Sequence, residues 1–204
     1  MKVLVSVASR HGATQEMGGV VAEQLRAAGH EVDEVAPDDV EHVERYEAVV
    51  LGSSVYVGRL ALGLRDLVDR QGGQLRERPV WLFWSGPGGD PPVPETVPDD
   101  VAEIARTVHA RGVQVFPGRL DRDELNISER ALVALTRADA GDFRDLDQVR
   151  EWSQEIVREL QAVVRGMGPA AGGGGCAGQA AGRGSGTASV TAPAASSGAR
   201  VSCR

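Results

Sequence analysis

The stretch from Lys2 to Thr14 gives the clearest indication of the fold. It reads Lys-Val-Leu-Val-Ser-Val-Ala-Ser-Arg-His-Gly-Ala-Thr. Its first seven residues form an apolar, β-branched run that is typical of a buried strand. Apolar residues then recur at helical spacing over residues 14–29. The junction between these two runs, residues 9–14, is small and polar, with one glycine and two hydroxyl side chains. It is either a generic tight turn or a cradle for a phosphate group.

The same alternation of strand and helix continues along the chain. Further strands are expected at 31–35, 47–52, 79–84 and 113–116. Further helices are expected from Leu60 to a stop at Gly72-Gly73, and from Val101, after the start signal Pro98-Asp99-Asp100, to Val108. A last helix is expected over 149–163 after a capping box at Asp145-Leu-Asp-Gln148, and a short helix or loop at 38–45. Alternating strands and helices predict an α/β fold. Its core is a doubly wound, five-stranded parallel sheet with helices on both faces.

The composition excludes several classes of protein. The chain has 204 residues, 42% hydrophobic and 25% charged, as in a globular protein. Its net charge of −7 argues against non-specific nucleic-acid binding. No apolar run reaches the roughly 18 residues of a transmembrane helix, and the first apolar run is too short for a secretion signal, so we expect a cytoplasmic protein. Cys176 and Cys203 show no metal-ligand spacing.

The composition changes near residue 166. Residues 166–204 are dominated by Gly, Ala and Ser, and they contain three arginines and no acidic residue. Such a segment buries too little apolar area to offset its ordering entropy. We therefore expect a globular domain over 1–165 and a disordered Gly/Ala/Ser-rich tail over 166–204.

In doubly wound sheets, ligands bind beyond the carboxyl ends of the strands. The loops to consider are therefore 9–14, 53–59 and 85–98. In the first loop, Gly12 lets the backbone approach an anion at a helix N-terminus, and Ser9 and Thr14 offer hydroxyl groups. In the alternative interpretation, Gly12 only permits the turn and Thr14 only caps the helix. The loop lacks the lysine of nucleotide triphosphate-binding loops and the Gly-x-Gly-x-x-Gly pattern of dinucleotide-binding ones.

The other two loops are also permissive. Residues 53–59 offer Tyr56, two hydroxyl groups and several backbone amides, a set that suits a flat heteroaromatic ligand. Residues 85–92 are rich in glycine and proline and bring backbone N–H groups close to a ligand. In the alternative interpretation, each of these loops is an ordinary surface connection that binds no ligand.

These stretches resemble the flavodoxin-like superfamily, whose sheet has the strand order 2-1-3-4-5. Ser-Arg-His-Gly-Ala-Thr at 9–14 resembles the phosphate loop of that superfamily, and Gly52–Gly58 resembles its first flavin-ring loop. Within it, Phe116-Pro-Gly-Arg-Leu120 and Gly141–Asp147, followed by the helix of Trp152, resemble the menaquinone-dependent protoporphyrinogen dehydrogenase type.

The resemblance implies a non-covalently bound FMN, which carries the redox chemistry itself, so no catalytic side chain and no metal are required. The resemblance places the phosphate on the first loop, and the isoalloxazine ring between the second loop and the start of the third. The implied cofactor-binding residues are Ser9, Arg10, His11, Gly12, Ala13, Thr14, Ser53, Ser54, Val55, Tyr56, Val57, Gly58, Ser85 and Gly86.

The function that the resemblance implies is an FMN-dependent oxidoreductase similar to protoporphyrinogen IX dehydrogenase of heme biosynthesis, passing electrons to a quinone-type acceptor. The alternative is a flavodoxin-like electron-transfer protein that has a redox partner but no small-molecule substrate. A third possibility is a flavin-free interaction domain that retains the fold alone. Residues 119–147 contain five Arg against eight Asp and Glu, so we expect repulsion from anionic lipid and no peripheral membrane contact.

Overall fold

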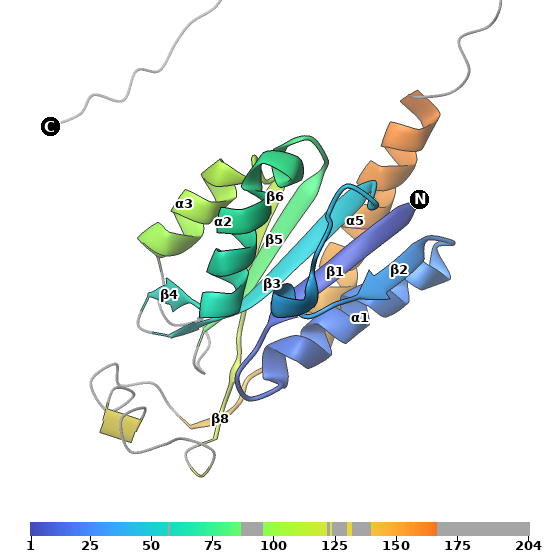
Figure 1. Cartoon of the computed structure of the whole chain (residues 1–204). Helices are drawn as coiled ribbons and strands as arrows, with labels where there is room; N and C mark the ends of the chain where they lie inside the picture. Colours follow the sequence, from blue (N-terminus) through green and yellow to red (C-terminus); the bar gives the residue numbers. More distant parts are fainter. Residues whose placement is uncertain (57, 87–95, 122, 124–129, 132–139, 167–204) are drawn as a thin grey trace, which may run out of the picture. The chain divides into compact units, whose positions relative to one another are not determined.

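The computed structural model describes residues 1–56, 58–86, 96–121, 123, 130–131 and 140–166 (Figure 1). The chain divides into the units Met1–Gly168 and Pro169–Arg204, and all described residues belong to the first. The predicted tail therefore lies outside the described residues, except Gly166, which ends the last helix. Ile127, Leu132 and Leu135, which are spaced to form one face of an amphipathic helix, lie outside them too.

A parallel sheet forms the centre of the domain (Figure 1). Its strands run in the order β2-β1-β3-β5-β6, which confirms the predicted order 2-1-3-4-5. The labels shift because β4, a two-residue strand that the sequence did not reveal, pairs antiparallel with the end of β3. The bounds are β1 Lys2–Ala8, β2 Glu31–Glu34, β3 Ala48–Tyr56, β4 Arg59–Leu60, β5 Val80–Ser85 and β6 Gly112–Phe116.

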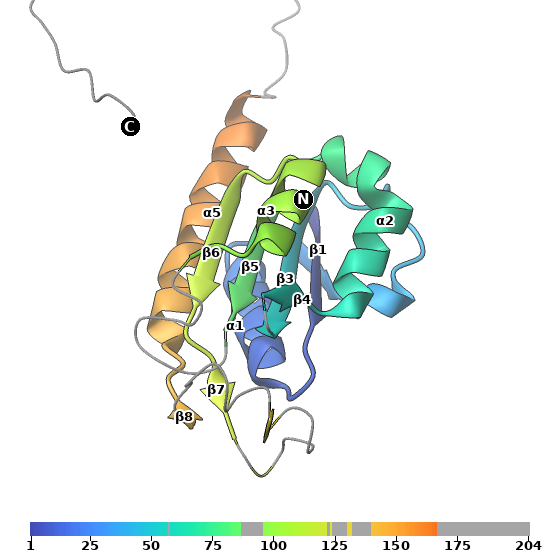
Figure 2. The same ribbon diagram turned by 90° about the vertical axis from the view of Figure 1, so that its left-hand side faces the viewer.

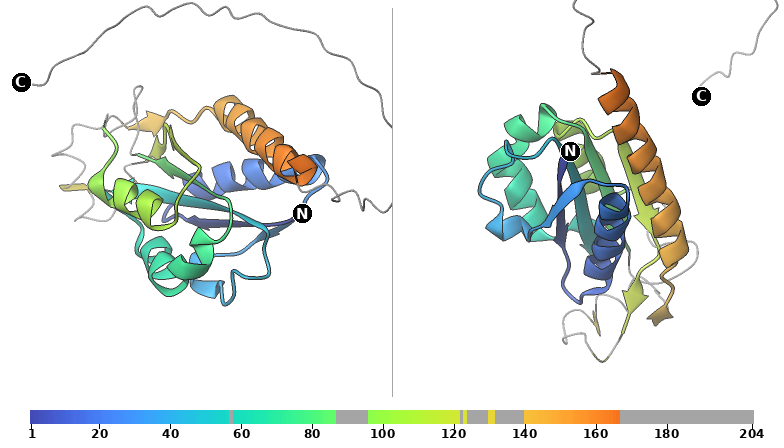
Figure 3. Two further views of the ribbon diagram at one scale, coloured as in Figure 1. Left: turned by 90° about the horizontal axis from the view of Figure 1, so that it is seen from above. Right: turned by 90° about the vertical axis from the view of Figure 1, so that its right-hand side faces the viewer.

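Helices cover both faces of the sheet, as Figure 3 shows. α1 (Ala13–Ala27) and α5 (Leu146–Gly166) lie on one face, where Met17 and Trp152 pack among the side chains of β1 and β5. α2 (Leu62–Arg76) and α3 (Asp99–Thr107) lie on the other, where Leu64 and Val101 join a second core cluster. A single 3-10 turn, η1 (Pro37–Asp39), precedes β3. None of the helices within the described residues is both long and apolar enough to span a membrane.

The prediction that Gly72-Gly73 ends the third helix was wrong, because α2 continues to Arg76. Two glycines cost a helix roughly 1 kcal/mol each relative to alanine. Leu75, two residues beyond Gly73, is completely buried in the core, and burying such a side chain stabilises the fold by about 2 kcal/mol. Tertiary packing of Leu75 thus offsets the low helix propensity of the two glycines, and the helix continues.

The prediction of an N-terminal cap on the last helix was correct. The Oδ1 atom of Asp145 accepts hydrogen bonds from the backbone N–H groups of Asp147 and Gln148, both at 3.0 Å. At the start of α1, by contrast, the N-cap residue is Gly12 and no side chain caps the helix. The alternative in which Thr14 serves as the cap is therefore wrong.

A small second sheet lies at the carboxyl end of the main sheet (Figure 2). β7 (Arg119–Leu120) follows β6 closely and pairs antiparallel with β8 (Gly141–Asp142), which precedes α5. Nothing in the alternation of apolar residues indicated these two short strands. They bring the segment after β6 to the same end of the sheet as the loops after β1, β3 and β5.

Candidate functional site

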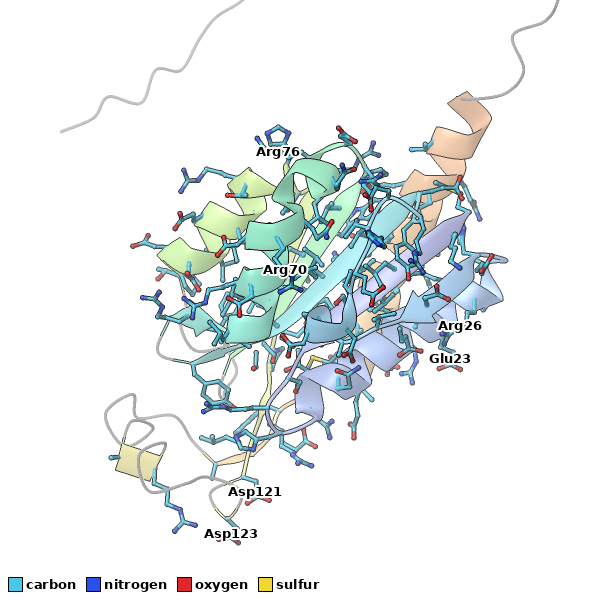
Figure 4. The ribbon with its side chains drawn as sticks, in the orientation of Figure 1. Glu23, Arg26, Arg70, Arg76, Asp121 and Asp123 are labelled. Carbon is cyan, nitrogen blue, oxygen red and sulfur yellow. The ribbon has the colours of Figure 1, made fainter. Side chains whose placement is uncertain are left out.

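The carboxyl ends of β1, β3 and β5, with the described residues that follow them, converge on one small cleft. Residues 87–95, the greater part of the predicted third loop, lie outside the described residues. The walls of the cleft come from the ends of β1, β3 and β5, as predicted, and also from β7. The lining residues are Ser9, His11, Ala13, Thr14, Ser54, Val55, Tyr56, Ser85, Gly86 and Arg119. Nine of these ten belong to the set that the sequence predicted. Two acidic side chains, Asp121 and Asp123, follow Arg119 in the chain and project beyond β7 (Figure 4).

The first loop has the geometry of an anion cradle. Gly12 adopts the left-handed conformation, with φ of 79°, and its carbonyl oxygen accepts the first backbone hydrogen bond of α1, from Glu16. A side chain at Gly12 would meet nothing within 4 Å, so the space above this backbone is open to a ligand. The first N–H groups of α1 have no partner within the helix and favour negative charge at this point.

A buried hydrogen bond connects the first loop to the third. The hydroxyl oxygens of Thr14 and Ser85 lie 2.8 Å apart, and both residues are almost completely buried. One residue is in the first turn of α1 and the other ends β5, so the contact fixes the distance between two walls of the cleft. This role of Thr14 replaces the predicted alternative of a helix cap.

The second loop supplies the aromatic wall. The rings of Tyr56 and His11 meet edge to face, with centroids 6.1 Å apart and an interplanar angle of 74°. The Oγ atom of Ser54 is buried, and among the described residues it has no hydrogen-bond partner. An unsatisfied buried hydroxyl costs about 1–3 kcal/mol, so a ligand that bonds to it would be stabilised.

Four predicted residues do not line the cleft. Ser53 instead shapes its wall, since its hydroxyl donates to the carbonyl of Ser54 and accepts from the N–H of Ala61. Gly12 and the exposed Arg10 flank lining residues, and Gly58 turns the chain into β4 with φ of 73°. Val57 lies outside the described residues.

The sequence interpretation missed Arg119 as a site residue. Arg119 belongs to the Phe116–Leu120 motif, which indicated a subtype but no contact. Its position depends on Gly118, because a Cβ atom there would lie 2.0 Å from the carbonyl oxygen of Gly86. Only glycine allows the chain to pass this close to the third loop. The sequence shows a glycine directly before a cation, but it does not reveal the contact with Gly86 that gives this pair its role.

The fold and this cleft define a domain of the FMN-binding α/β class. The sequence matches the flavodoxin domain family over residues 4–147, and the chain belongs to that family. Family membership implies FMN as the cofactor, which confirms the prediction. The open space over Gly12, the hydroxyl groups of the first loop and the unsatisfied Ser54 hydroxyl fit this group.

Curated relatives at low identity are named NAD(P)H dehydrogenase (quinone). One from Bradyrhizobium is 32% identical over 94 residues, and one from Azorhizobium caulinodans is 33% identical over 94 residues. Each match covers 35% of this chain and 47% of the relative, so the chain spans about half the length of the curated relatives it matches. The predicted protoporphyrinogen dehydrogenase type stays a prediction.

Solved structures confirm the fold. A flavodoxin from the domain Archaea superposes with a TM-score of 0.55 at 16% identity, covering 79% of this chain and 99% of that one. A flavodoxin from Streptococcus pneumoniae gives 0.55 at 18% identity, covering 80% and 99%. The rubredoxin:oxygen oxidoreductase of Desulfovibrio gigas gives 0.54 at 18% identity, covering 80% of this chain and 37% of that one.

Proposed function

We propose that the chain is an FMN-dependent oxidoreductase that passes electrons through the flavin to a quinone-type acceptor. The observation that carries the proposal is the meeting of three separate strand ends in one cleft, two of them joined by the buried Thr14–Ser85 hydrogen bond. A fold retained without its cofactor has no need to keep such a cleft together.

In this proposal the chain's own residues bind and orient the cofactor. The phosphate lies over Gly12, where it receives the N–H groups at the start of α1 and the hydroxyl of Ser9. Tyr56 and the backbone of Ser85–Gly86 flank the ring, and Ser54 donates a hydrogen bond to it. The bound flavin supplies the electron transfer, and these contacts position and tune it.

The quinone-type acceptor is supported by the names of the curated relatives. Two electron donors are in question. Those names suggest NAD(P)H, whereas the resemblance of 116–120 and 141–147 to the protoporphyrinogen dehydrogenase type suggests a porphyrinogen. We favour the porphyrinogen, because the resembling segments include β7 and β8, which lie beside the cleft.

The second candidate function is an electron carrier without a substrate of its own. The observation that favours it is the net charge of −7, which suits docking to a basic redox partner. A carrier would exchange electrons with a reductase but not with a small donor.

The experiment that tests the proposal begins with FMN titrated into the purified protein, followed by flavin fluorescence. The loaded protein is then mixed without oxygen with protoporphyrinogen IX, or with NADPH, and its absorbance near 450 nm is recorded. Loss of that band with either donor, and its return on addition of menadione, would support the oxidoreductase. A flavin that neither donor reduces, but that a flavodoxin reductase does, would establish the carrier instead. Failure of the folded protein to bind FMN would refute both.

A further inference from the structure

Arg119 gives the cleft a positive wall that the three predicted loops do not supply. Among the described residues that line the cleft, none is acidic, and Arg119 and His11 are the basic ones. The whole chain, by contrast, carries more acidic than basic residues. Arg119 also lines an adjoining hollow that contains Asp121, Asp123 and Asp142, so it stands between the cleft and an acidic surface.

The backbone around Arg119 is held in place from two sides. On one side, Gly118 passes so close to the carbonyl of Gly86 that no other residue fits. On the other, Arg119 pairs with Asp142 in the β7–β8 ladder. Arg144 anchors that ladder, because it bonds to the Asp142 carboxylate at 2.6 and 2.8 Å and also pairs with Glu16 at the start of α1.

Asp142 is the carboxylate nearest in register to Arg119. Its pKa lies below the usual value, chiefly because of the hydrogen bond from Arg144, with a smaller contribution from the charge of Arg119. The Arg144 side chain donates to both carboxylate oxygens of Asp142. The half-buried Arg119 side chain lines the cleft.

We propose that Arg119 is a positioning residue for the flavin, whose guanidinium stabilises negative charge on the reduced isoalloxazine ring. Two-electron reduction of FMN with uptake of one proton leaves one added negative charge at the N1–C2 carbonyl edge of the ring. A fixed cation beside that edge binds the reduced form more tightly than the oxidised form and so raises the reduction potential. This inference rests on the proposed binding of FMN in this cleft.

The location of Arg119 favours the ring over the phosphate. The phosphate loop follows β1, whereas Arg119 follows β6, and β3 and β5 separate these two strands in the sheet. The immediate neighbour of the Gly118–Arg119 segment is Gly86, part of the third loop. That loop and Tyr56 are the segments that we assign to the ring.

The test compares the FMN-loaded wild-type protein with Arg119→Gln and Arg119→Met, which both remove the charge, and with Arg119→Lys, which keeps it. Arg111→Gln is the matched control, because the exposed Arg111 directly precedes β6, at the opposite end of that strand. The two-electron potential of the bound flavin is measured without oxygen against a reference dye, with dithionite as reductant. Dissociation constants of oxidised FMN and of riboflavin are measured in parallel.

We expect Arg119→Gln and Arg119→Met to weaken binding of reduced FMN at least tenfold more than binding of oxidised FMN. This ratio corresponds to a fall of about 30 mV in the two-electron potential. Arg119→Lys should retain most of the potential, and Arg111→Gln should leave it unchanged. An unchanged potential in both neutral variants would overturn the inference, and so would a loss of oxidised FMN binding that spares riboflavin, since that pattern indicates a phosphate contact. If the wild-type protein binds no FMN, the proposed function fails before any variant is compared.

Discussion

Gly12 is the residue whose conformation shapes the phosphate cradle, and Gly29 offers a matched comparison. Both have positive φ, 79° and 87°, and a side chain at either would meet nothing within 4 Å. Alanine in this conformation costs roughly 1–2 kcal/mol, so Gly12→Ala and Gly29→Ala should lower the free energy of unfolding in urea by similar amounts. Only Gly12→Ala should also weaken FMN binding, by tenfold or more, because its methyl group enters the space assigned to the phosphate. Equal FMN affinities in the two variants would contradict that assignment.

Thr14 contributes to stability through its hydroxyl contact with Ser85. Thr14→Val keeps the shape of the side chain but leaves the buried Ser85 hydroxyl without this partner, which should cost about 1–3 kcal/mol of unfolding free energy. Adding Ser85→Ala to Thr14→Val should recover part of that loss, since no polar group is then left unsatisfied. A double-mutant cycle in urea measures the coupling. Strictly additive losses would show that the two hydroxyl groups do not depend on each other.

At the scale of elements, Arg144 connects β8 and the start of α5 to α1. Its side chain is only 13% exposed, and it pairs with Asp142 and with Glu16. We expect Arg144→Gln to lower the unfolding free energy by about 1 kcal/mol at low salt, because its carboxylate partners are largely exposed and therefore screened. The loss should shrink in 0.5 M NaCl. A control variant, Arg150→Gln, removes an exposed pair with Asp147 and should have little effect. If Arg150→Gln lowers the unfolding free energy as much as Arg144→Gln does, the connection to α1 does not account for the stabilisation by Arg144.

The elements also show how far the sequence alone determines this structure. The five long strands and their order could be predicted, because buried β-branched runs and a familiar loop at 9–14 are local signals. The end of α2 could not, since the burial of Leu75 is decided by tertiary contacts rather than by the two glycines before it. β7 and β8 are two residues each, too short to show any period.

The candidate site likewise contains residues that the sequence predicted and one that it did not. Residues on the three long loops were predicted, because the carboxyl ends of β1, β3 and β5 lie at one edge of the sheet. Arg119 was missed because it reaches the cleft through a close contact between Gly118 and Gly86, which no spacing in the sequence reveals. Contacts between residues far apart in the chain are the features of the site that local sequence patterns do not predict.

At the scale of the whole molecule, the tail remains a prediction that truncation can test. Removing the residues after Gly168 deletes three arginines and no acidic residue, which changes the net charge from −7 to −10. If the domain folds independently, as its composition suggests, the unfolding free energy should change by less than about 0.5 kcal/mol. FMN affinity should also be unchanged. A marked loss in either measurement would show that the tail packs on the domain.

The stability of the whole domain should depend on pH on both sides of neutrality. The pKa values of Asp33 and Asp142 are lowered, chiefly by hydrogen bonds from Lys2 and Arg144, so their contributions are lost as the pH falls below about 3.8. The pKa of Lys2 is raised by hydrogen bonds to Glu31 and Asp33, and burial raises that of Tyr46. Their contributions are lost as the pH rises above about 10.

His30 should set the slope between these limits. Both of its ring nitrogens are buried, and neither has a hydrogen-bond partner among the described residues. Burial, assisted by the N-terminal ammonium, lowers its pKa from the ordinary 6.5, although the charge of Glu47 acts in the opposite direction. The unfolded chain therefore binds a proton at a higher pH than the folded domain does, and stability falls as the pH drops below 6.5.

We expect the unfolding free energy to be flat from pH 7 to 9 and to decline between pH 6.5 and 5. His30→Gln should flatten this decline, because glutamine takes up no proton in that range. His42→Gln replaces an exposed histidine and should leave the slope unchanged. Urea unfolding at half-unit steps of pH measures all three proteins. A decline that persists unchanged in His30→Gln would assign the acid sensitivity of the domain to other groups, because the buried imidazole would then make no difference.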